Sequence, residues 1–345
     1  MPRAVEVHEV PGVEEALATR EPATCARRIA AILEGGADRK EVARTAALAS
    51  ARRFAPTLPP PHALLALGAS LDLAASAPQP ALPIVQACAL AASEWRDVAG
   101  SATARSITGD ELHLAQSFHT SVRGREAAEA DSIFAGLLRE GDERRLAGDA
   151  LFEVCAQDLA GEGHKLTFAV GSWRLGRALG WLRGAPLLRP AVRLAAEATQ
   201  ELGAYGATLR DVGRSRLDVE LAARNVAPID AVARNTYAIA LAAGPERIVA
   251  DLIAGLKRGR TPAGYADLIA TTAMERLVGD PAALEPTLFC LAVRFVLGFS
   301  RTATHVLAVL QAGRLVAGLP STSKRRSTAT TPAARQASRP RSPIP

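Results

Sequence analysis

Apolar residues recur at helical spacing in nearly every segment of this chain, and glycines and prolines mark the turns between the segments. No segment alternates convincingly between polar and apolar residues, the pattern of a half-buried strand. Alanine and leucine fill most apolar positions and only 4% of residues are aromatic, a composition that favours helix over strand. The sequence therefore predicts an all-α fold.

The predicted helices begin and end at recognisable signals. The first covers residues 22–36, and the second follows Asp38, a good N-cap, and runs to about Phe54. Prolines between residues 56 and 61 then exclude helix, and His62 opens the next one. Further helices are predicted over residues 80–97, 110–122, 125–140, 143–160, 164–181, 184–201, 216–226, 229–243, 245–257, 262–278, 284–298 and 301–317.

Three stretches are predicted to lie outside helices. Residues 98–109 are rich in Ser, Thr and Gly, and Gly203, Gly206 and Gly213 mark a second irregular stretch. Residues 320–345 contain almost no large apolar side chains, which predicts a disordered tail.

The net charge of +6 belongs to that tail. The chain has 41 Lys plus Arg against 35 Asp plus Glu, and residues 321–345 hold six of the basic residues and no acidic one. The rest of the chain is therefore electrically balanced. A nucleic-acid-binding body needs a basic stripe on its folded surface, so we expect no nucleic-acid partner for the folded part.

The sequence indicates a cytoplasmic protein. Its first ten residues include acidic side chains and no apolar run, unlike a signal peptide. The most hydrophobic stretch, Leu284 to Leu319, is interrupted by Arg294, Arg301, His305 and Arg314, which predicts two buried helices and no membrane span. The four cysteines are far apart and form no CxxC pair, as expected of small buried side chains in a reducing compartment.

Three segments share one plan. In each, a helix ends at a glycine, a capped helix follows, and a later helix carries a histidine in its first turn. The glycines and histidines are Gly36, Gly141 and Gly259, and His62, His164 and His305. We predict an irregular multi-helix array of about three quasi-repeats, each a helical hairpin plus a histidine-headed helix. The first two occupy residues 1–201, and the third, residues 202–319, packs on them ahead of the disordered basic tail, residues 320–345.

The three helix-heading histidines are the candidate metal ligands. Small residues dominate the helix face below each of them, which leaves space for a neighbouring helix or for a ligand. If His62, His164 and His305 converge on one cavity, they could bind Fe or Zn, or His62 and His164 could act as catalytic acid/base groups. Alternatively, each histidine caps its own helix or bonds a neighbouring loop. His113 and His119 are weaker candidates for an outer ligand, and the ExxH motif of di-iron bundles is absent.

Two further residues are candidates for contact with a cofactor. Ser172 lies eight residues after His164 and so shares its helix face, and Trp173 follows it. Trp173 and Trp181 are themselves eight residues apart, a spacing for which core packing is the default interpretation.

The stretch GHKLTFAVGSWRLGRALGW, Gly163 to Trp181, is similar to a segment of a group of bacterial all-helical proteins of unassigned function. The unit from Gly35 to about Asp97, with its SEWRDV segment, is similar as well, and this resemblance covers roughly residues 25–200. It implies a fold and no chemistry. More distantly, the histidine-headed helices resemble those of questin oxidase-like proteins, whose fungal members are linked to Baeyer–Villiger-type ring oxidation. The segment around His305 departs from that pattern.

Three functions remain open. The first is an oxidoreductase that acts on an apolar or aromatic small molecule in a buried cavity lined by His62, His164 and His305. The second is a non-catalytic helical-repeat scaffold that binds a partner, as α-solenoids do. The third is a small-molecule carrier with the same cavity and no chemistry.

Overall fold

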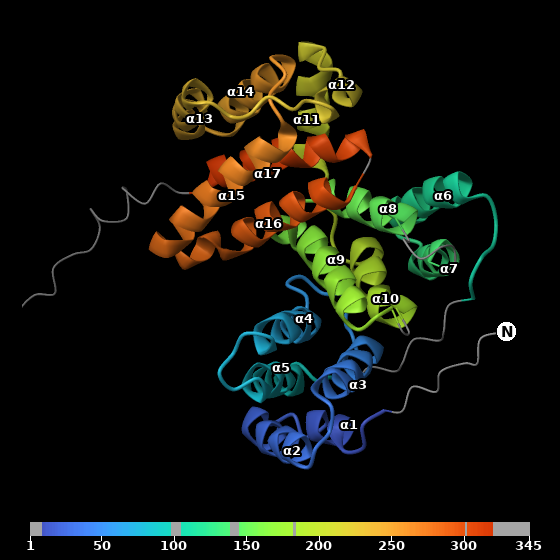
Figure 1. Ribbon diagram of the computed structural model, residues 1–345. Helices are drawn as coiled ribbons and strands as arrows, with labels where there is room; N and C mark the ends of the chain where they lie inside the picture. Colours follow the sequence, from blue (N-terminus) through green and yellow to red (C-terminus); the bar gives the residue numbers. More distant parts are fainter. Residues whose placement is uncertain (1–8, 98–104, 139–144, 182–183, 301, 320–345) are drawn as a thin grey trace, which may run out of the picture.

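The computed structural model describes residues 9–97, 105–138, 145–181, 184–300 and 302–319. Within these ranges the chain forms 17 α-helices and two 3₁₀ turns and no sheet, so the predicted all-α class is confirmed (Figure 1). The quasi-repeats and their boundaries stay a prediction. The predicted disordered tail, residues 320–345, and residues 98–104 of the predicted loop lie outside the described residues.

Five helices form the N-terminal part, shown in blue at the bottom of Figure 1. They are α1 (Val13–Leu17), α2 (Pro22–Glu34), α3 (Arg39–Arg52), α4 (Ala63–Ala74) and α5 (Ala81–Ser93). The predicted cap is confirmed, because the Asp38 carboxylate accepts hydrogen bonds from the backbone N–H groups of Lys40 and Glu41. Helix α1 was not predicted, since five residues are too few to show a helical period.

Helix α9 lies at the centre of the molecule and packs against α4, α8, α10 and α16 (Figure 1). The helices of this middle part are α6 (Glu111–Arg123), α7 (Ala127–Leu137), α8 (Arg145–Ala156), α9 (Ala160–Ala178) and α10 (Gly184–Glu197). The regular part of α9 starts at His164 as predicted, because the backbone of the three residues before it is left-handed.

The C-terminal helices join α9 through α16. They are α11 (Gly203–Ser215), α12 (Val219–Ala223), α13 (Ala231–Ala243), α14 (Pro245–Lys257), α15 (Pro262–Gly279), α16 (Leu284–Phe299) and α17 (Val306–Gly318), with 3₁₀ turns at Pro281–Ala283 and Ala303–His305. Helix α17 is largely buried and packs against α14, α15 and α16.

The prediction of an irregular stretch at residues 203–213 is wrong, because these residues form helix α11. Tyr205, Thr208 and Val212 lie at helical spacing on one face and pack toward the core, where α11 contacts α14 and α17. Glycine disfavours helix by only about 1 kcal/mol per residue. Packing of this apolar face outweighs that preference.

The small residues on α4 and α9 serve close helix packing. A Cβ atom placed on Gly171 would lie 2.1 Å from Cδ2 of Leu65, and one on Gly68 would lie 3.5 Å from Cβ of Leu175. The sequence left open whether these faces contact a neighbouring helix or a ligand. At these two glycines they contact a neighbouring helix. The two histidine-headed helices are thereby held against each other.

One helical stretch in the described part of the chain, Pro281–Phe299, is long and apolar enough to cross a membrane. Of its most apolar window, 44% is buried, and α16 within it packs against α9, α15 and α17. Core helices of soluble proteins share this length and composition. The absence of a membrane span in this region therefore stays a prediction.

Candidate metal centre

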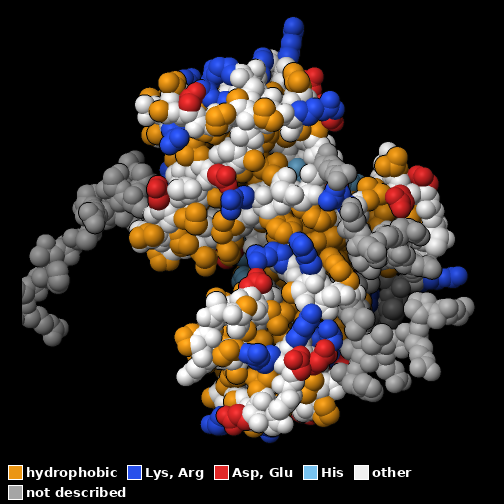
Figure 2. Space-filling model, viewed as in Figure 1, with side chains coloured by type: hydrophobic (Ala, Val, Ile, Leu, Met, Phe, Trp, Pro, Cys, Tyr) orange, Lys and Arg blue, Asp and Glu red, His pale blue; other side chains and the backbone are white. Residues whose placement is uncertain are grey.

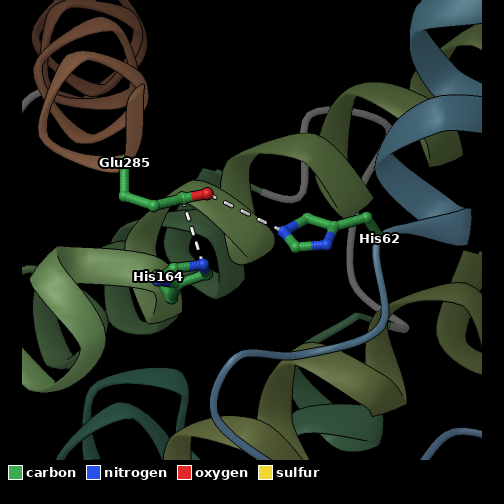
Figure 3. Close-up of side chains that lie close together, drawn as sticks. All are labelled: His62, His164 and Glu285. Atoms are coloured by element: carbon green, nitrogen blue, oxygen red, sulfur yellow. Dashed lines mark ion pairs between the residues drawn. The ribbon is translucent and has the colours of Figure 1, made fainter. Parts of the chain in front are cut away.

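His62, His164 and Glu285 come together from three separate parts of the chain (Figure 3). One possible ligand atom from each residue lies within 4.8 Å of the other two. Nε2 of His164 is 3.1 Å from Oε2 of Glu285, and Nε2 of His62 is 4.0 Å from Oε1 of the same carboxylate. The two imidazole rings have centroids 5.8 Å apart. Each residue stands at the start of its helix, α4, α9 or α16.

The backbone before His164 sets the orientation of its ring. Gly161, Glu162 and Gly163 all have positive φ, at 60°, 60° and 85°, and for Glu162 this conformation is unfavourable. The turn brings the carbonyl oxygen of Gly161 against Nδ1 of His164. In the neutral ring, donation by Nδ1–H to this carbonyl leaves the lone pair on Nε2, which faces Glu285. Metal-binding histidines are held in the same way in many proteins.

Gly163 also fixes the distance between α9 and α16. A Cβ atom on this residue would lie 2.2 Å from Cδ2 of Phe289, so only glycine lets the Phe289 ring pack there. Phe289 is one turn after Glu285 in α16. The contact therefore holds the carboxylate at the level of His164.

His62 is positioned by Glu94, at the end of α5. The backbone N–H groups of His62 and Ala63 donate to Oε1 and Oε2 of Glu94, at 2.9 and 2.8 Å. A carboxylate at this place satisfies two otherwise free donors of α4 and complements its dipole. Glu94 belongs to the SEWRDV segment that the sequence analysis singled out for resemblance alone.

The donor atoms of this cluster fit a metal ion. Nε2 of His164 and Oε2 of Glu285 are buried, and neither has a hydrogen-bond partner although they lie 3.1 Å apart. Burying such atoms without a partner costs stability. A divalent cation between them would satisfy both, and two imidazoles with one carboxylate form the ligand set of non-haem Fe(II) oxygenases.

The cluster is open to solvent on the His62 side. The side chain of His62 is 36% exposed, against 22% for Glu285 and 8% for His164. Figure 2 shows the surface hollowed between the N-terminal helices and the α15–α16 pair, with histidine atoms visible at the inner end of the hollow. A small molecule therefore has a path to the cluster.

His305, the third predicted ligand, is not part of this cluster. It lines a pocket together with Leu297 and Ser300, near the C-terminal end of α16. Glu285 is at the other end of that helix, twelve residues before Leu297, or about 18 Å at 1.5 Å per residue. The structure thus places the carboxylate of Glu285 where the sequence analysis expected a third imidazole.

The two predicted cofactor residues lie further along α9. Ser172 is two turns from His164, roughly 12 Å along the helix axis, and its buried Oγ has no hydrogen-bond partner. Trp173 is buried in an aromatic cluster, with ring centroids 4.8 Å from Trp181 and 5.5 Å from Phe152. Trp173 therefore has the core-packing role that its spacing to Trp181 indicated.

The alternative for the histidines, local bonding, holds in part. His62 and His305 occupy N-cap positions, but their side chains make no capping hydrogen bond. His164 does contact its own loop through Nδ1. This local contact uses one nitrogen and leaves Nε2 for Glu285.

Glu285 was missed by the sequence analysis. No motif connects it to either histidine, since the three residues meet only through tertiary packing. One signal was present, because Glu285 is the only acidic residue in the hydrophobic stretch from residue 284 to residue 319. A single carboxylate in so apolar a segment needs a partner when it is partly buried.

The cysteines offer no thiolate near neutral pH. All four are buried and free of disulfides. Burial raises the pKa of Cys25 to about 11 and the pKa values of Cys88, Cys155 and Cys290 to about 12. Nucleophilic or metal-binding sulfur chemistry therefore has no support at these positions.

Comparison of the chain with protein-family models, curated proteins and solved structures finds no match. The resemblances drawn from the GHK and SEWRDV segments thus stay predictions.

Proposed function

We propose that His62, His164 and Glu285 bind one divalent transition metal, iron or zinc, and that the protein is an oxidoreductase for an apolar or aromatic small molecule. The observation that carries the proposal is the buried pair of lone-pair atoms, Nε2 of His164 and Oε2 of Glu285, which face each other at 3.1 Å without a hydrogen bond. Polar protein atoms in such a position are normally paired.

The choice of redox chemistry rests on the ligand set. Two histidines and one carboxylate leave coordination positions free for a substrate and for oxygen, and bound Fe(II) would supply oxygen activation there. The remote resemblance to questin oxidase-like proteins favours the same reaction class. A zinc ion in this site would instead supply Lewis-acid chemistry.

The protein's own residues hold this geometry. The Gly161 carbonyl fixes the His164 ring, Glu94 fixes the start of the helix that carries His62, and Phe289 holds Glu285 in place. The more exposed His62 borders the open side, where an apolar substrate would enter.

Metal analysis of protein prepared without a tag and reconstituted with Fe(II), or with Zn(II), tests the proposal. We expect one equivalent per chain, and its loss in His62→Ala, His164→Ala and Glu285→Ala. His113→Ala is the matched control, because His113 is exposed on α6 and outside the cluster. Circular dichroism verifies that each variant folds. A wild-type protein that binds neither metal, or variants that bind as much as His113→Ala, would refute the metal centre.

Oxidoreductase chemistry needs a separate test. Fe(II)-loaded protein is incubated with oxygen and a panel of aromatic and alicyclic ketones and phenols, and products are followed by mass spectrometry. Incorporation of oxygen that depends on His164 supports the proposal. A stoichiometric zinc protein without turnover would leave the metal site standing and overturn the reaction class.

A further inference from the structure

A second group of buried and half-buried polar side chains lies near His305, at the far end of α16. The side chain of His305 is only 2% exposed, and neither ring nitrogen has a hydrogen-bond partner. Its Nε2 lies 3.8 Å from Oδ1 of Asp149, which is also without a partner. One turn along α8, Glu153 lies 3.8 Å from Nε2 of His119. Two carboxylates one turn apart on α8 thus each face a histidine from another element.

Burial shifts the pKa values of this group toward its uncharged forms. Burial lowers the pKa of His305 to about 4 and also lowers the pKa of His119. It raises the pKa values of Asp149 and Glu153. The imidazole of His305 is therefore neutral at pH 7 and offers one donor and one acceptor.

His305 lines a pocket of about 360 Å³. Leu297, Val306 and Pro262 give it apolar walls, and Thr302 also lines it. Pockets of this size with a few converging polar groups are typical of small-molecule sites. The buried imidazole lines this pocket without a hydrogen-bond partner, and a bound ligand would supply one.

Among the described residues that line the pocket, acidic and basic side chains balance. The lining holds Glu220 and Arg224, one acidic and one basic side chain, four residues apart. With a neutral imidazole in the wall, these residues favour neither an anion nor a cation.

We infer that the pocket around His305 binds a small neutral molecule with an apolar ring-sized body and a hydroxyl group, and that this hydroxyl bonds to His305. A hydroxyl both donates and accepts, so it matches a neutral imidazole. The body of the ligand lies against Leu297, Val306 and Pro262. This site is separate from the proposed metal centre, roughly 18 Å away along α16, and stands whether or not that centre binds metal.

Saturation-transfer NMR on the full chain at pH 7 tests this with four probes of one size: phenol, anisole, benzoate and benzylammonium. We expect saturable binding of phenol, and binding weaker by about tenfold for anisole, which has no donor, and for the two ions. His305→Leu removes both nitrogens at similar bulk and is expected to lower phenol affinity by about tenfold as well. In metal-free protein, His164→Ala should bind phenol as the wild type does, which separates this site from the metal centre.

A second pair of variants guards against misfolding of His305→Leu. Ala263→Phe fills the pocket from its exposed rim and should abolish phenol binding, whereas Ala238→Phe, on the exposed face of α13, should not. Absence of saturable phenol binding, equal binding of all four probes, or binding that survives both His305→Leu and Ala263→Phe would overturn the inference.

Discussion

Nε2 of His164 and Oε2 of Glu285 face each other at 3.1 Å, buried and without a hydrogen bond. The Gly161 carbonyl occupies the other nitrogen of His164, so in its neutral form this imidazole presents an acceptor to an acceptor. Two facing acceptors repel unless a cation or a proton lies between them. The two atoms should therefore repel each other in the metal-free protein and attract the same cation in the metal-bound protein.

Glu285→Gln should affect the two forms in opposite directions. The amide can donate to Nε2 of His164 and so stabilise the metal-free protein by about 1 kcal/mol, while it removes the anionic ligand and so abolishes stoichiometric metal binding. Chemical denaturation in the presence of EDTA gives the first quantity and metal analysis the second. A variant that is less stable without metal would show that the carboxylate is already satisfied in the protein.

Gly163→Ala should destabilise the protein more than an ordinary glycine substitution at positive φ. The new methyl group meets both the backbone strain at φ 85° and the Phe289 ring, for a loss of roughly 2–4 kcal/mol in the free energy of unfolding. Gly180→Ala is the matched control, because Gly180 has φ 79° but no atom within 4 Å of the added carbon. We expect it to lose about 1 kcal/mol, the strain alone. Equal losses in urea denaturation would mean that Phe289 moves aside freely.

Glu94→Gln tests whether the residue positions His62. Loss of the charge at the start of α4 should lower stability by about 1 kcal/mol and metal affinity by about tenfold. Asp110→Asn is the control, because Asp110 caps α6 in a comparable way, away from the cluster. Both variants should lose stability and only Glu94→Gln should lose metal affinity, as measured by competition with a metal indicator. Unchanged metal affinity would restrict Glu94 to a structural role.

Local signals were enough to predict the fold class and most helix bounds. Asp38 as a cap, Pro22 as a first residue and Gly35 after the last turn act within a few residues of where they stand. Helix α11 was missed because its glycines were given more weight than the helical spacing of Tyr205, Thr208 and Val212, the face that packs toward α14 and α17.

The candidate site could be predicted in part. His62 and His164 share a position at a helix start, and the small residues behind them bring their helices together. His305 has the same local position, yet α16 carries it away from Glu285 because sequence spacing says nothing of where a helix ends in space. Glu285 itself depends on which helix lies opposite His164, and only the structure supplies that.

The buried His305 should make stability depend on pH in a defined window. Its pKa falls from an ordinary value near 6.5 in the unfolded chain to about 4 in the folded protein, so between these values the unfolded state binds more protons. Stability from this residue is complete above about pH 6.5 and is lost as pH falls toward 4, by about 3 kcal/mol in all.

The raised pKa values of Asp149 and Glu153 act in the opposite direction, so the wild-type profile alone mixes the contributions. The difference between wild type and His305→Leu isolates the histidine, because both proteins keep the two carboxylates. We expect the wild type to lose about 3 kcal/mol relative to the variant between pH 7 and pH 4, measured by urea denaturation at half-unit steps. A difference that stays constant over this range would show that His305 titrates normally, and hence that its ring reaches water in the folded protein.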